Sequence, residues 1–530
     1  MKLSFKSPQN TQAWKGYHLP QYDVAAVAAR TQKNPRWLHF GAGNIFRAFP
    51  CVVAQRLIEN GDMDTGIVCC EGYDDEIVTA CFRPVDNLSI AVTLNPDGNI
   101  DKEVVGSLCE SLTMKDDAAR VAEIFRSDSL QMVSFTITEK GYVLRDDQRH
   151  FLPAVGQDIL QGPQAASTFA GRITALCLAR ARAGLAPVAL VSLDNCQNNS
   201  HLLRRMTTDL AGGWLEHGHI TQEDFDYITK KLTYPLSMID KITPRPDAKV
   251  QKMLEEDGFE DNYTIITDRH TYTAPFVNAE ETEYLVIEDQ YTNGRPPLEQ
   301  GGVLYADRET VDKVEKMKVC TCLNPLHTAM SIYGCLLDYT LISAEMKDED
   351  LCGLITKMGY IEAMPVVVDP GVLKPADFIG AVLNKRLPNP FMPDAPQRIA
   401  TDTSQKLSIR FGETIKAYQA KGLDMDELVL IPLVLAGYAR YLKGVNDAGQ
   451  PFEPSPDPLL EELQAIVAPL EIRESAQDMS CLKQLYTRKD VFGLDLYEAG
   501  LGEKIEAMAA ELFAGPGAVR KTLHKYVSAR

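Results

Sequence analysis

The sequence predicts an α/β protein with an N-terminal domain built on a parallel sheet and a mostly α-helical C-terminal domain. In the first half, short apolar runs rich in β-formers alternate with helical stretches, whereas long helical patterns dominate after about residue 310. A segment rich in Gly and Pro, 291–302, lies between the two regions. Because 530 residues are too many for one ordinary core, we expect two domains, at 1–300 and 301–530.

The first elements form a βαβ pattern. Residues 36–40 and 66–70 are predicted as strands, and 45–59 as the helix between them. Near-continuous apolar strands of this kind predict a parallel sheet that is covered by helices on both faces. The further predicted elements are a helix at 116–126, a strand at 131–138, a helix at 167–183, a strand at 188–193 and helices at 325–337, 394–410 and 427–443.

Composition and charge narrow the class of protein. The net charge of −19 would repel a polyphosphate backbone, and no dense run of Lys and Arg reverses it locally, so we expect no nucleic-acid partner. The twelve cysteines form no CxxC pairs, which disfavours a zinc site or a disulfide framework, and we expect no metal. The most apolar stretch, 428–438, is interrupted by Pro432, so no membrane role is expected. We expect a cytoplasmic protein with reduced thiols, as a monomer or a homodimer.

The segment "HFGAGNIFRAF", 39–49, follows the first predicted strand and is typical of a phosphate-binding turn. Gly41 permits a tight turn, and Gly43 lets the backbone approach a pyrophosphate bound at the helix N-terminus. The strict GxGxxG pattern fails because Phe46 stands in the place of the third glycine. The next residue, Arg47, would reach a phosphate or hold the helix to its neighbours. The predicted cofactor-binding residues of this segment are Gly41, Gly43, Asn44, Ile45, Phe46 and Arg47.

An acidic residue after the second predicted strand favours NAD over NADP. Glu71 directly follows the strand 66–70, where a carboxylate would accept hydrogen bonds from the ribose hydroxyls of the adenosine. The same carboxylate would repel a 2′-phosphate. A plain strand-to-helix turn with a surface glutamate remains the alternative for this stretch considered alone.

The segment "KVCTCLNPLHTAM", 318–330, carries a possible set of groups for alcohol oxidation. Pro325 disfavours the α region for the residue before it, so Asn324 is predicted as a helix N-cap with His327 one turn further on. Removing a hydride from a secondary alcohol also requires the hydroxyl proton to leave, and the neutral amine of a buried lysine, Lys318, can accept it. The alternative is a solvated lysine beside a structural cap and a packed histidine.

A third candidate segment, "SLDNCQNNS" at 192–200, directly follows an apolar strand. That position lies at the carboxyl end of the predicted sheet, where open α/β sheets bind their ligands. Asn195 could there polarise a carbonyl oxygen. An Asn-rich turn without a function is the alternative.

Together these segments resemble the mannitol dehydrogenase family, the long-chain, zinc-independent polyol and sugar-acid dehydrogenases. The resemblance runs from about residue 36 to 445, and no single motif carries it. "HFGAGNIFRAF" looks like the family's GxGxFxRAH cofactor motif, and "SLDN" looks like its SCDN box. Further matches are "FTITEKGY", "YPLSMIDKITP" like FPNxMVDRITP, "YLVIEDQYTNGRPPLEQGGV" like WVIEDxFxxGRP, and "RLPNP" like RFSNP.

The resemblance implies an N-terminal Rossmann-type NAD domain, a helical C-terminal domain and a cleft between them. It implies that Lys318 is the general base and that Asn195 and Asn324 stabilise the oxyanion. His327 would position the substrate, and Glu315 would relay the proton outward. The remaining implied substrate-binding residues are Asp240, Arg386 and Lys406.

The interval between the lysine and the asparagine departs from the family pattern. The family usually has its lysine five residues before the asparagine, whereas six separate Lys318 from Asn324. A local bulge would absorb the extra residue. Lys316 is the rival general base.

The substrate is expected to be a sugar acid or a polyol. The "TEKGY" form is closer to the hexuronate-pathway members of the family, and Arg386, Lys406 and Lys140 would neutralise a sugar carboxylate. This favours interconversion of D-mannonate and D-fructuronate. Oxidation of mannitol or arabinitol to the 2-ketose and reduction of tagaturonate are the alternatives, and an NAD-binding sensor or scaffold without activity is the alternative outside enzymes.

Overall fold

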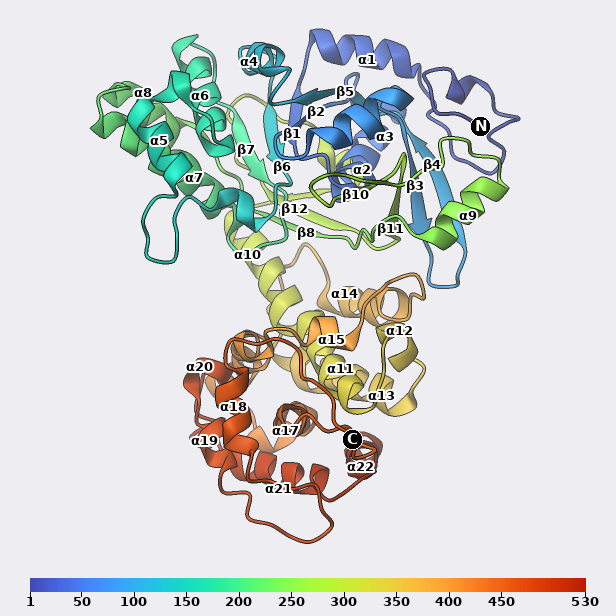
Figure 1. Cartoon of the computed structure of the whole chain (residues 1–530), viewed down its shortest axis with the longest axis vertical. Coiled ribbons are helices and arrows are strands. Elements are labelled where there is room, and N and C mark those ends of the chain that lie inside the picture. Colours follow the sequence, from blue (N-terminus) through green and yellow to red (C-terminus); the bar gives the residue numbers. More distant parts are fainter. The chain divides into compact units, whose positions relative to one another are not determined.

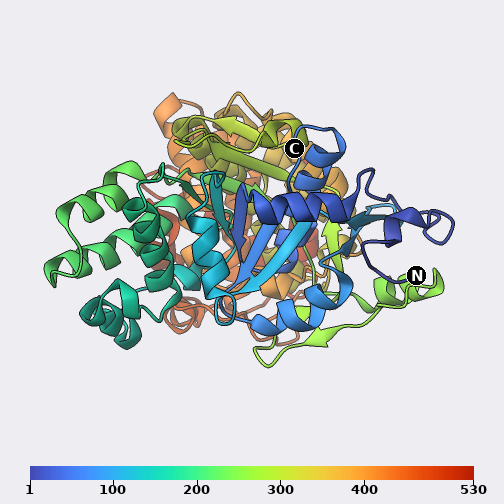
Figure 2. The same cartoon turned by 90° about the horizontal axis from the view of Figure 1, so that it is seen from above.

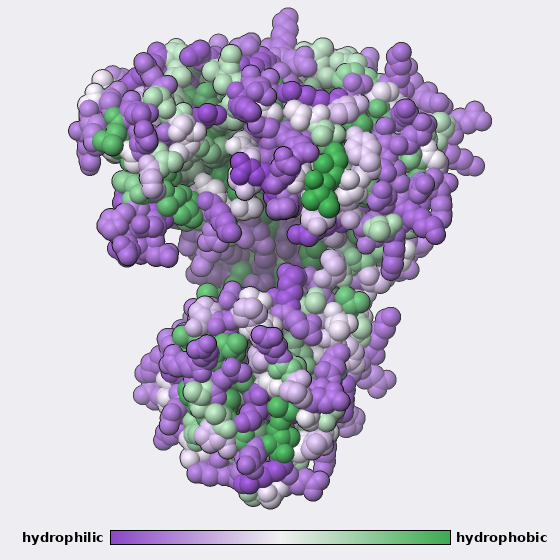
Figure 3. All heavy atoms as spheres, in the orientation of Figure 1, coloured by the Kyte–Doolittle hydropathy of each residue, from purple (hydrophilic) through white to green (hydrophobic).

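The computed structural model describes all 530 residues and divides into two compact units. Unit 1 comprises residues 1–95 and 99–311, and unit 2 comprises residues 96–98 and 312–530 (Figure 1). Hydrophilic residues cover most of the visible surface of each unit, with apolar residues in small separate patches (Figure 3). None of the helices has the length and apolar character needed to cross a membrane.

A five-stranded sheet forms the centre of unit 1. Its strands are all parallel and follow the order β5-β2-β1-β6-β7, as the Rossmann-type prediction requires. The order reverses between β1 and β6, which places a topological switch point at their carboxyl ends. The strands are β1 Trp37–Phe40, β2 Ile67–Glu71, β5 Leu108–Thr113, β6 Met132–Phe135 and β7 Ala189–Ser192.

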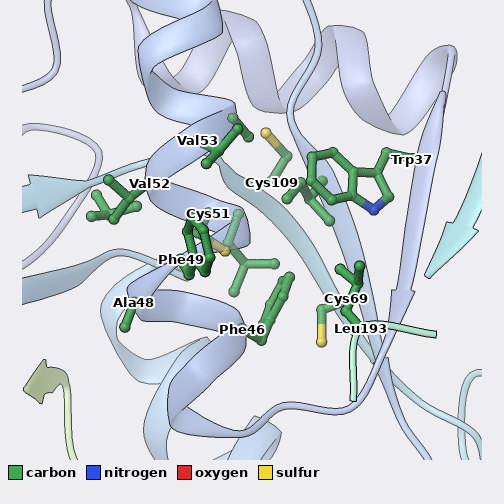
Figure 4. Packing of buried hydrophobic residues seen from close by; sticks show 14 of the residues in the cluster. Trp37, Phe46, Ala48, Phe49, Cys51, Val52, Val53, Cys69, Cys109 and Leu193 are labelled. Carbon is green, nitrogen blue, oxygen red and sulfur yellow. The ribbon is translucent and has the colours of Figure 1, made fainter. Parts of the chain in front are cut away.

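Apolar clusters bury both faces of this sheet. Trp37 belongs to one cluster, together with residues of α2 and α3, whereas Leu38 and Phe40 belong to the other, with residues of α4, α6 and α7. Figure 4 shows the first cluster, in which Phe46 and Phe49 lie between their helices and the sheet. This alternation along β1 confirms the predicted sheet with two covered faces.

Further helices surround the sheet of unit 1. Figures 1 and 2 show α5 to α8 gathered on the β7 side of the sheet, where α7 packs directly against β7. The helices are α1 Val24–Lys33, α2 Asn44–Ala48, α3 Pro50–Glu59, α4 Ala118–Phe125, α5 Pro153–Gln161, α6 Phe169–Arg182, α7 Asn199–Glu216, α8 Gln222–Asp226 and α9 Ala248–Glu256.

The single helix predicted at 45–59 is two helices in the structure. Helix α2 ends at Ala48 and α3 begins at Pro50. Between them Phe49 adopts φ −131° and ψ −71°, outside the helical region. Pro50 explains the break, because its ring disfavours the α conformation of the preceding residue.

Two smaller sheets of unit 1 were not predicted. One has the order β11-β3-β4 and the other the order β13-β12-β8. Their pairings join segments far apart in the chain, so local patterns carry little signal for them. The strands are β3 Ser89–Leu94, β4 Ile100–Val105, β8 Ser237–Asp240, β11 Phe276–Glu280, β12 Tyr284–Glu288 and β13 Leu304–Ala306, and a short pair is formed by β9 Ile265–Ile266 and β10 Tyr272–Thr273.

Unit 2 is helical and is built around α17 Leu430–Leu442. Every residue of α17 is buried, and the helix packs against α11, α18, α21 and α22. A helix that is apolar on all sides belongs in a core, as here. The other helices are α10 Arg308–Met317, in which the boundary between the units falls, α11 Asn324–Leu336, α12 Ile342–Glu345, α13 Glu349–Lys357, α14 Pro375–Ala381, α15 Pro396–Ile399, α16 Glu413–Lys421, α18 Leu460–Val467, α19 Leu482–Tyr486, α20 Lys489–Phe492, α21 Gly502–Leu512 and α22 Ala518–Ala529.

The long helix predicted at 394–410 is wrong. In that range the structure has the short α15, then turns, and then the start of the π-helix η13 Ser408–Gly412. Asp402 adopts a left-handed φ of 53°, and Thr403 donates its hydroxyl hydrogen to the Ala400 carbonyl. Short polar side chains of this kind bond to nearby backbone groups and so compete with the helix.

Four segments of unit 2 are π-helical, with hydrogen bonds that span five residues. They are η8 Lys318–Cys322, η9 Met358–Ala363, η11 Val382–Arg386 and η13 Ser408–Gly412. In η8, for example, the Leu323 N–H donates to the Lys318 carbonyl at 3.1 Å. A π-helical turn holds one residue more than an α-helical turn and is frequent at functional sites.

A buried carboxyl group without a hydrogen bond lies in the core of unit 2. Glu345 in α12 is fully buried, and neither of its carboxyl oxygens has a partner. A Cβ atom added at Gly334 of α11 would lie 2.2 Å from Glu345 Oε1, so the two helices are in close contact. Burial, followed by the charge of Asp348, raises the pKa of Glu345 from 4.5 to about 9. Glu345 is therefore neutral at pH 7 in the folded protein.

Replacing Glu345 by methionine should stabilise unit 2, increasingly so at alkaline pH. Because the carboxyl pKa is higher in the folded than in the unfolded chain, the wild type should lose stability as the pH rises from 4.5 to about 9. The loss should approach about 1.4 kcal/mol per pH unit, and Glu345→Met should lack it. Urea unfolding between pH 5 and 8.5 measures the difference. The exposed Glu349→Met is the control, and an equal pH dependence in wild type and Glu345→Met would contradict the assignment.

Candidate functional site

The glycine turn after β1 forms a cradle that fits a phosphate. Gly41 adopts φ 110°, and a Cβ atom there would lie 2.2 Å from the Thr136 carbonyl oxygen, so no side chain fits. Around Gly43, by contrast, a Cβ atom would meet no atom within 4 Å. Gly43 is the N-cap of α2, whose first-turn N–H groups have no acceptor within the helix. The turn thus presents free N–H groups to open space at the switch point of the sheet.

Glu71 clamps this turn to the loop after β2. Its Oε2 accepts a hydrogen bond from the Ala42 N–H at 2.6 Å, and its Oε1 accepts from three successive N–H groups, those of Gly72, Tyr73 and Asp74. A carboxylate oxygen has two acceptor sites, so Oε2 can accept one further hydrogen bond. The carboxylate expected to bind a ribose is therefore mainly a support of the turn, with one acceptor site left.

The side chains of Phe46 and Arg47 hold α2 in place and do not face a ligand. The Phe46 ring is fully buried and stacks on the buried His39 ring, with centroids 4.1 Å apart. The Arg47 guanidinium is 2% exposed and donates to the Ala274 carbonyl at 2.6 Å and to Thr273 Oγ1 at 3.2 Å. Of the two roles considered for Arg47, the structure shows the one that holds the helix to its neighbours. Asn44 and Ile45, in contrast, are partly exposed.

Asp194 connects the loops that follow β6 and β7. It is 9% exposed and accepts hydrogen bonds from the Tyr142 hydroxyl at 2.6 Å and from the N–H groups of Ile137 and Thr138. Thr138 has φ 62° and ψ 163°, a region that β-branched residues avoid, so its N–H···carboxylate bond holds a strained turn. Burial raises the pKa of Asp194. Sequence reasoning missed this role of Asp194. An acidic residue directly after a buried strand was the signal that could have indicated it.

The other predicted residues of unit 1 lie on two different strand ends and one loop. Asn195 follows β7 and is exposed. Asp240 ends β8, where it pairs with Tyr284 of β12, and is 6% exposed. Lys140 is exposed in the short helical turn Glu139–Tyr142.

The bulge expected before Asn324 is present as the π-helix η8. Lys318 is its first residue and is 4% exposed, whereas the rival Lys316 is exposed in the last turn of α10. A π-helical turn takes up one extra residue, so a lysine six residues before the asparagine can hold the position of one five residues before it. Burial raises the pKa of Glu315, and the nearby positive charge of Lys318 opposes that rise.

Asn324 and His327 share the first turn of α11. The prediction of Asn324 as N-cap is wrong by one residue, because Leu323 is the N-cap and Asn324 begins the helix despite Pro325. No protein group bonds to the Asn324 side-chain amide, and the buried Nε2 of His327 also has no partner. Burial lowers the pKa of His327 to about 4; Asp394 raises it, and Arg386 and Arg410 lower it further. His327 is therefore a neutral imidazole near pH 7.

The two predicted cations of the substrate site differ in their surroundings. Arg386 is 2% exposed at the end of the π-helix η11, and its charge acts on His327. The Lys406 ammonium donates to the backbone carbonyls of Thr401 and Ile399. Those bonds fix the turn after α15, so Lys406 has a structural task that the sequence did not predict.

Arg410 is a cation of this site that sequence reasoning missed. It lies in η13, which packs against η8 and α11. Its Nη1 donates to Thr328 Oγ1 at 2.5 Å, and Thr328, the residue after His327, donates in turn to the Asn324 carbonyl at 2.9 Å. Nothing in the sequence indicated this position, because the predicted helix 394–410 placed Arg410 at the last residue of one long helix.

Comparisons with known proteins agree with this architecture. Residues 35–300 match the mannitol dehydrogenase Rossmann domain, and residues 310–512 match the mannitol dehydrogenase C-terminal domain. A D-mannonate oxidoreductase of Thermotoga maritima is 46% identical over 99% of each chain. A mannitol 2-dehydrogenase of Pyrenophora tritici-repentis is 31% identical over 81% of this chain and 73% of its own. The Pseudomonas fluorescens mannitol 2-dehydrogenase, solved with NAD and D-mannitol, shares the fold with a TM-score of 0.70 at 24% identity and full coverage of both chains.

A Rossmann-type domain with a glycine cradle, joined to a helical domain with a buried lysine near an asparagine and a histidine, defines an oxidoreductase that acts on CH–OH groups. The family models cover most of the chain. The protein belongs to the mannitol dehydrogenase family.

Proposed function

We propose that this protein interconverts D-mannonate and D-fructuronate with NAD, using Lys318 as general base and no metal ion. The observation that carries the reaction type is the buried Lys318 in the π-helical turn before Asn324 and His327. The choice of sugar acid is supported by the 46% identity, over nearly the whole chain, to a D-mannonate oxidoreductase.

The cradle in unit 1 fits a dinucleotide. Gly41 and Gly43 would let the pyrophosphate approach the backbone, and the first-turn N–H groups of α2, at Asn44 and Ile45, would bind it. Glu71 would accept one ribose hydroxyl through the remaining site of its Oε2. When bound, NAD would take up the hydride of the alcohol.

Lys318 would take the proton of the reacting hydroxyl during oxidation and return it during reduction. Lys318 is buried in the π-helical turn directly before α11, the helix that carries the groups proposed to hold the alcohol. Glu315 lies one helical turn before the lysine and is near enough for their charges to interact. Its raised pKa suits a carboxyl group that passes a proton between the lysine and water.

The asparagine amides and the histidine would hold the reacting oxygen. The Asn324 side chain offers unused N–H groups at the start of α11, and the family resemblance assigns Asn195 to the same task. His327 stays neutral because its pKa is about 4, so one ring nitrogen can donate and the other accept a hydrogen bond. This suits a group that orients a hydroxyl without adding charge.

Replacing Lys318 by methionine should lower kcat by about 100- to 10,000-fold, the usual effect of losing a general base. NADH affinity should stay within about threefold of the wild type, because the lysine lies in unit 2 and the proposed cradle in unit 1. Steady-state rates and NADH fluorescence titration measure the two effects. The exposed Lys316→Met is the matched control. Full activity of Lys318→Met would transfer the role to Lys316 or dismiss it.

NADH should be preferred over NADPH by at least about tenfold in kcat/KM. A 2′-phosphate would have to approach the Glu71 carboxylate, whose position is fixed by four N–H groups, and no arginine binds Glu71 to offset its charge. Initial rates with each cofactor at a saturating sugar concentration test this. Equal efficiency with both would refute the role of Glu71.

A substrate screen tests the proposed function itself. NADH oxidation should be fastest with D-fructuronate and slower with tagaturonate, fructose and xylulose. Fastest turnover of fructose would instead support a mannitol 2-dehydrogenase, the activity named for the 31% identical relative. Binding of NADH without turnover of any keto sugar would support a sensor or scaffold.

A further inference from the structure

The guanidinium of Arg410 has no acidic partner. Its only hydrogen bond goes to Thr328 Oγ1, and no carboxylate forms an ion pair with it. Removal from water lowers its pKa to about 10, so the group still carries its charge at pH 7. A partly buried positive charge without a counterion is costly, and such groups usually have a partner.

The other arginines of unit 2 are satisfied differently. Exposed arginines pair with carboxylates, as Arg398 does with Asp394. The fully buried Arg440 donates instead to three backbone carbonyls, those of Leu512, Val445 and Asn446. Ion pairs with carboxylates are also formed by Arg473, Arg488, Arg520 and Arg530. Arg410 differs from all of these because it has neither a carboxylate partner nor a set of backbone acceptors, only the single bond to Thr328.

The free edge of Arg410 remains accessible. Its Nε and Nη2 atoms make no hydrogen bond, yet they are not among the polar atoms sealed from solvent. The bond to Thr328 fixes the guanidinium beside the first turn of α11, which carries Asn324 and His327. A small anion can therefore reach two parallel N–H groups next to the residues proposed for the reaction.

We infer that Arg410 binds the carboxylate of the sugar acid through its Nε–Nη2 edge and thereby selects sugar acids over neutral polyols. This inference rests on the proposed function and deepens it. In D-fructuronate the carboxylate is at the end of the carbon chain remote from the reacting carbonyl, so Arg410 orients the substrate and takes no part in proton transfer. Arg386 adds positive charge near His327, and Thr328 holds Arg410 in position.

The test compares a charged substrate with its neutral analogue. Initial rates of NADH oxidation are measured with D-fructuronate and with its primary amide, for the wild type and for Arg410→Met. Loss of a charge-assisted bidentate contact should lower kcat/KM for fructuronate by about 10- to 100-fold. The amide cannot form that contact, so its kcat/KM should change less than about threefold. Arg473→Met, which removes an exposed arginine of unit 2 that pairs with Glu471, should change neither.

A structural role of Arg410 would give a different pattern. If Arg410→Met lowers kcat/KM equally for fructuronate and for its amide, or changes kcat/KM for neither, the inference is overturned. Thr328→Val should show the same selectivity loss at a smaller size, with the melting temperature of each variant as the check on folding. If Thr328→Val loses no selectivity for fructuronate over its amide, Thr328 does not hold Arg410 in position. That result would contradict the geometry on which the inference rests.

A binding measurement tests this inference separately from the proposed reaction. If the wild type turns over neither fructuronate nor its amide, the proposed function fails, and calorimetric titration with D-mannonate decides the inference alone. D-Mannonate should bind the wild type at least about tenfold more tightly than Arg410→Met, while D-mannitol should not distinguish them. Failure of the wild type to bind mannonate, or equal binding by both proteins, would overturn the role of Arg410.

Discussion

The extra residue of a π-helical turn is the constraint on which the site in unit 2 depends. Lys318, Arg386 and Arg410 each lie in a separate π-helix, and η13, which carries Arg410, packs against η8, which carries Lys318. A π-turn shifts the residues before it around the helix axis, so side chains that would otherwise face outward can face a neighbouring helix. The chain therefore accommodates the extra residue before Asn324 by a change from α-helix to π-helix, and Lys318 stays buried.

In unit 1, charge and close packing replace the third glycine of the dinucleotide motif. A third glycine would allow close helix–strand packing, whereas here Phe46 fills that space by stacking on His39. The turn itself is held from the other side by Glu71, whose four N–H partners come from both loops at the strand ends. The cradle thus keeps its geometry although its sequence pattern is incomplete, because what a phosphate requires is free N–H groups and space.

Much of the fold could be predicted from the sequence, because periodicity and strand composition are local signals. The central sheet with two covered faces followed from apolar runs such as 36–40, and the helical second half from long amphipathic patterns. The small sheets could not be predicted, since β11 pairs with the distant β3. In the site, residue types and spacing indicated Lys318, Asn324 and His327. The tasks of Arg47, Lys406 and Arg410 depend on their partners, which only the tertiary structure shows.

An acidic protein can recognise an anionic sugar because the two effects act over different distances. The net charge of −19 repels an approaching anion, but salt screens that repulsion beyond about 10 Å. A partly buried guanidinium acts at contact, where the effective dielectric constant is lower. A carboxylate bound at Arg410 would also cancel part of the positive field at His327. Burial is the largest cause of the lowered histidine pKa, ahead of the arginine charges, so the imidazole would stay neutral with the acid bound.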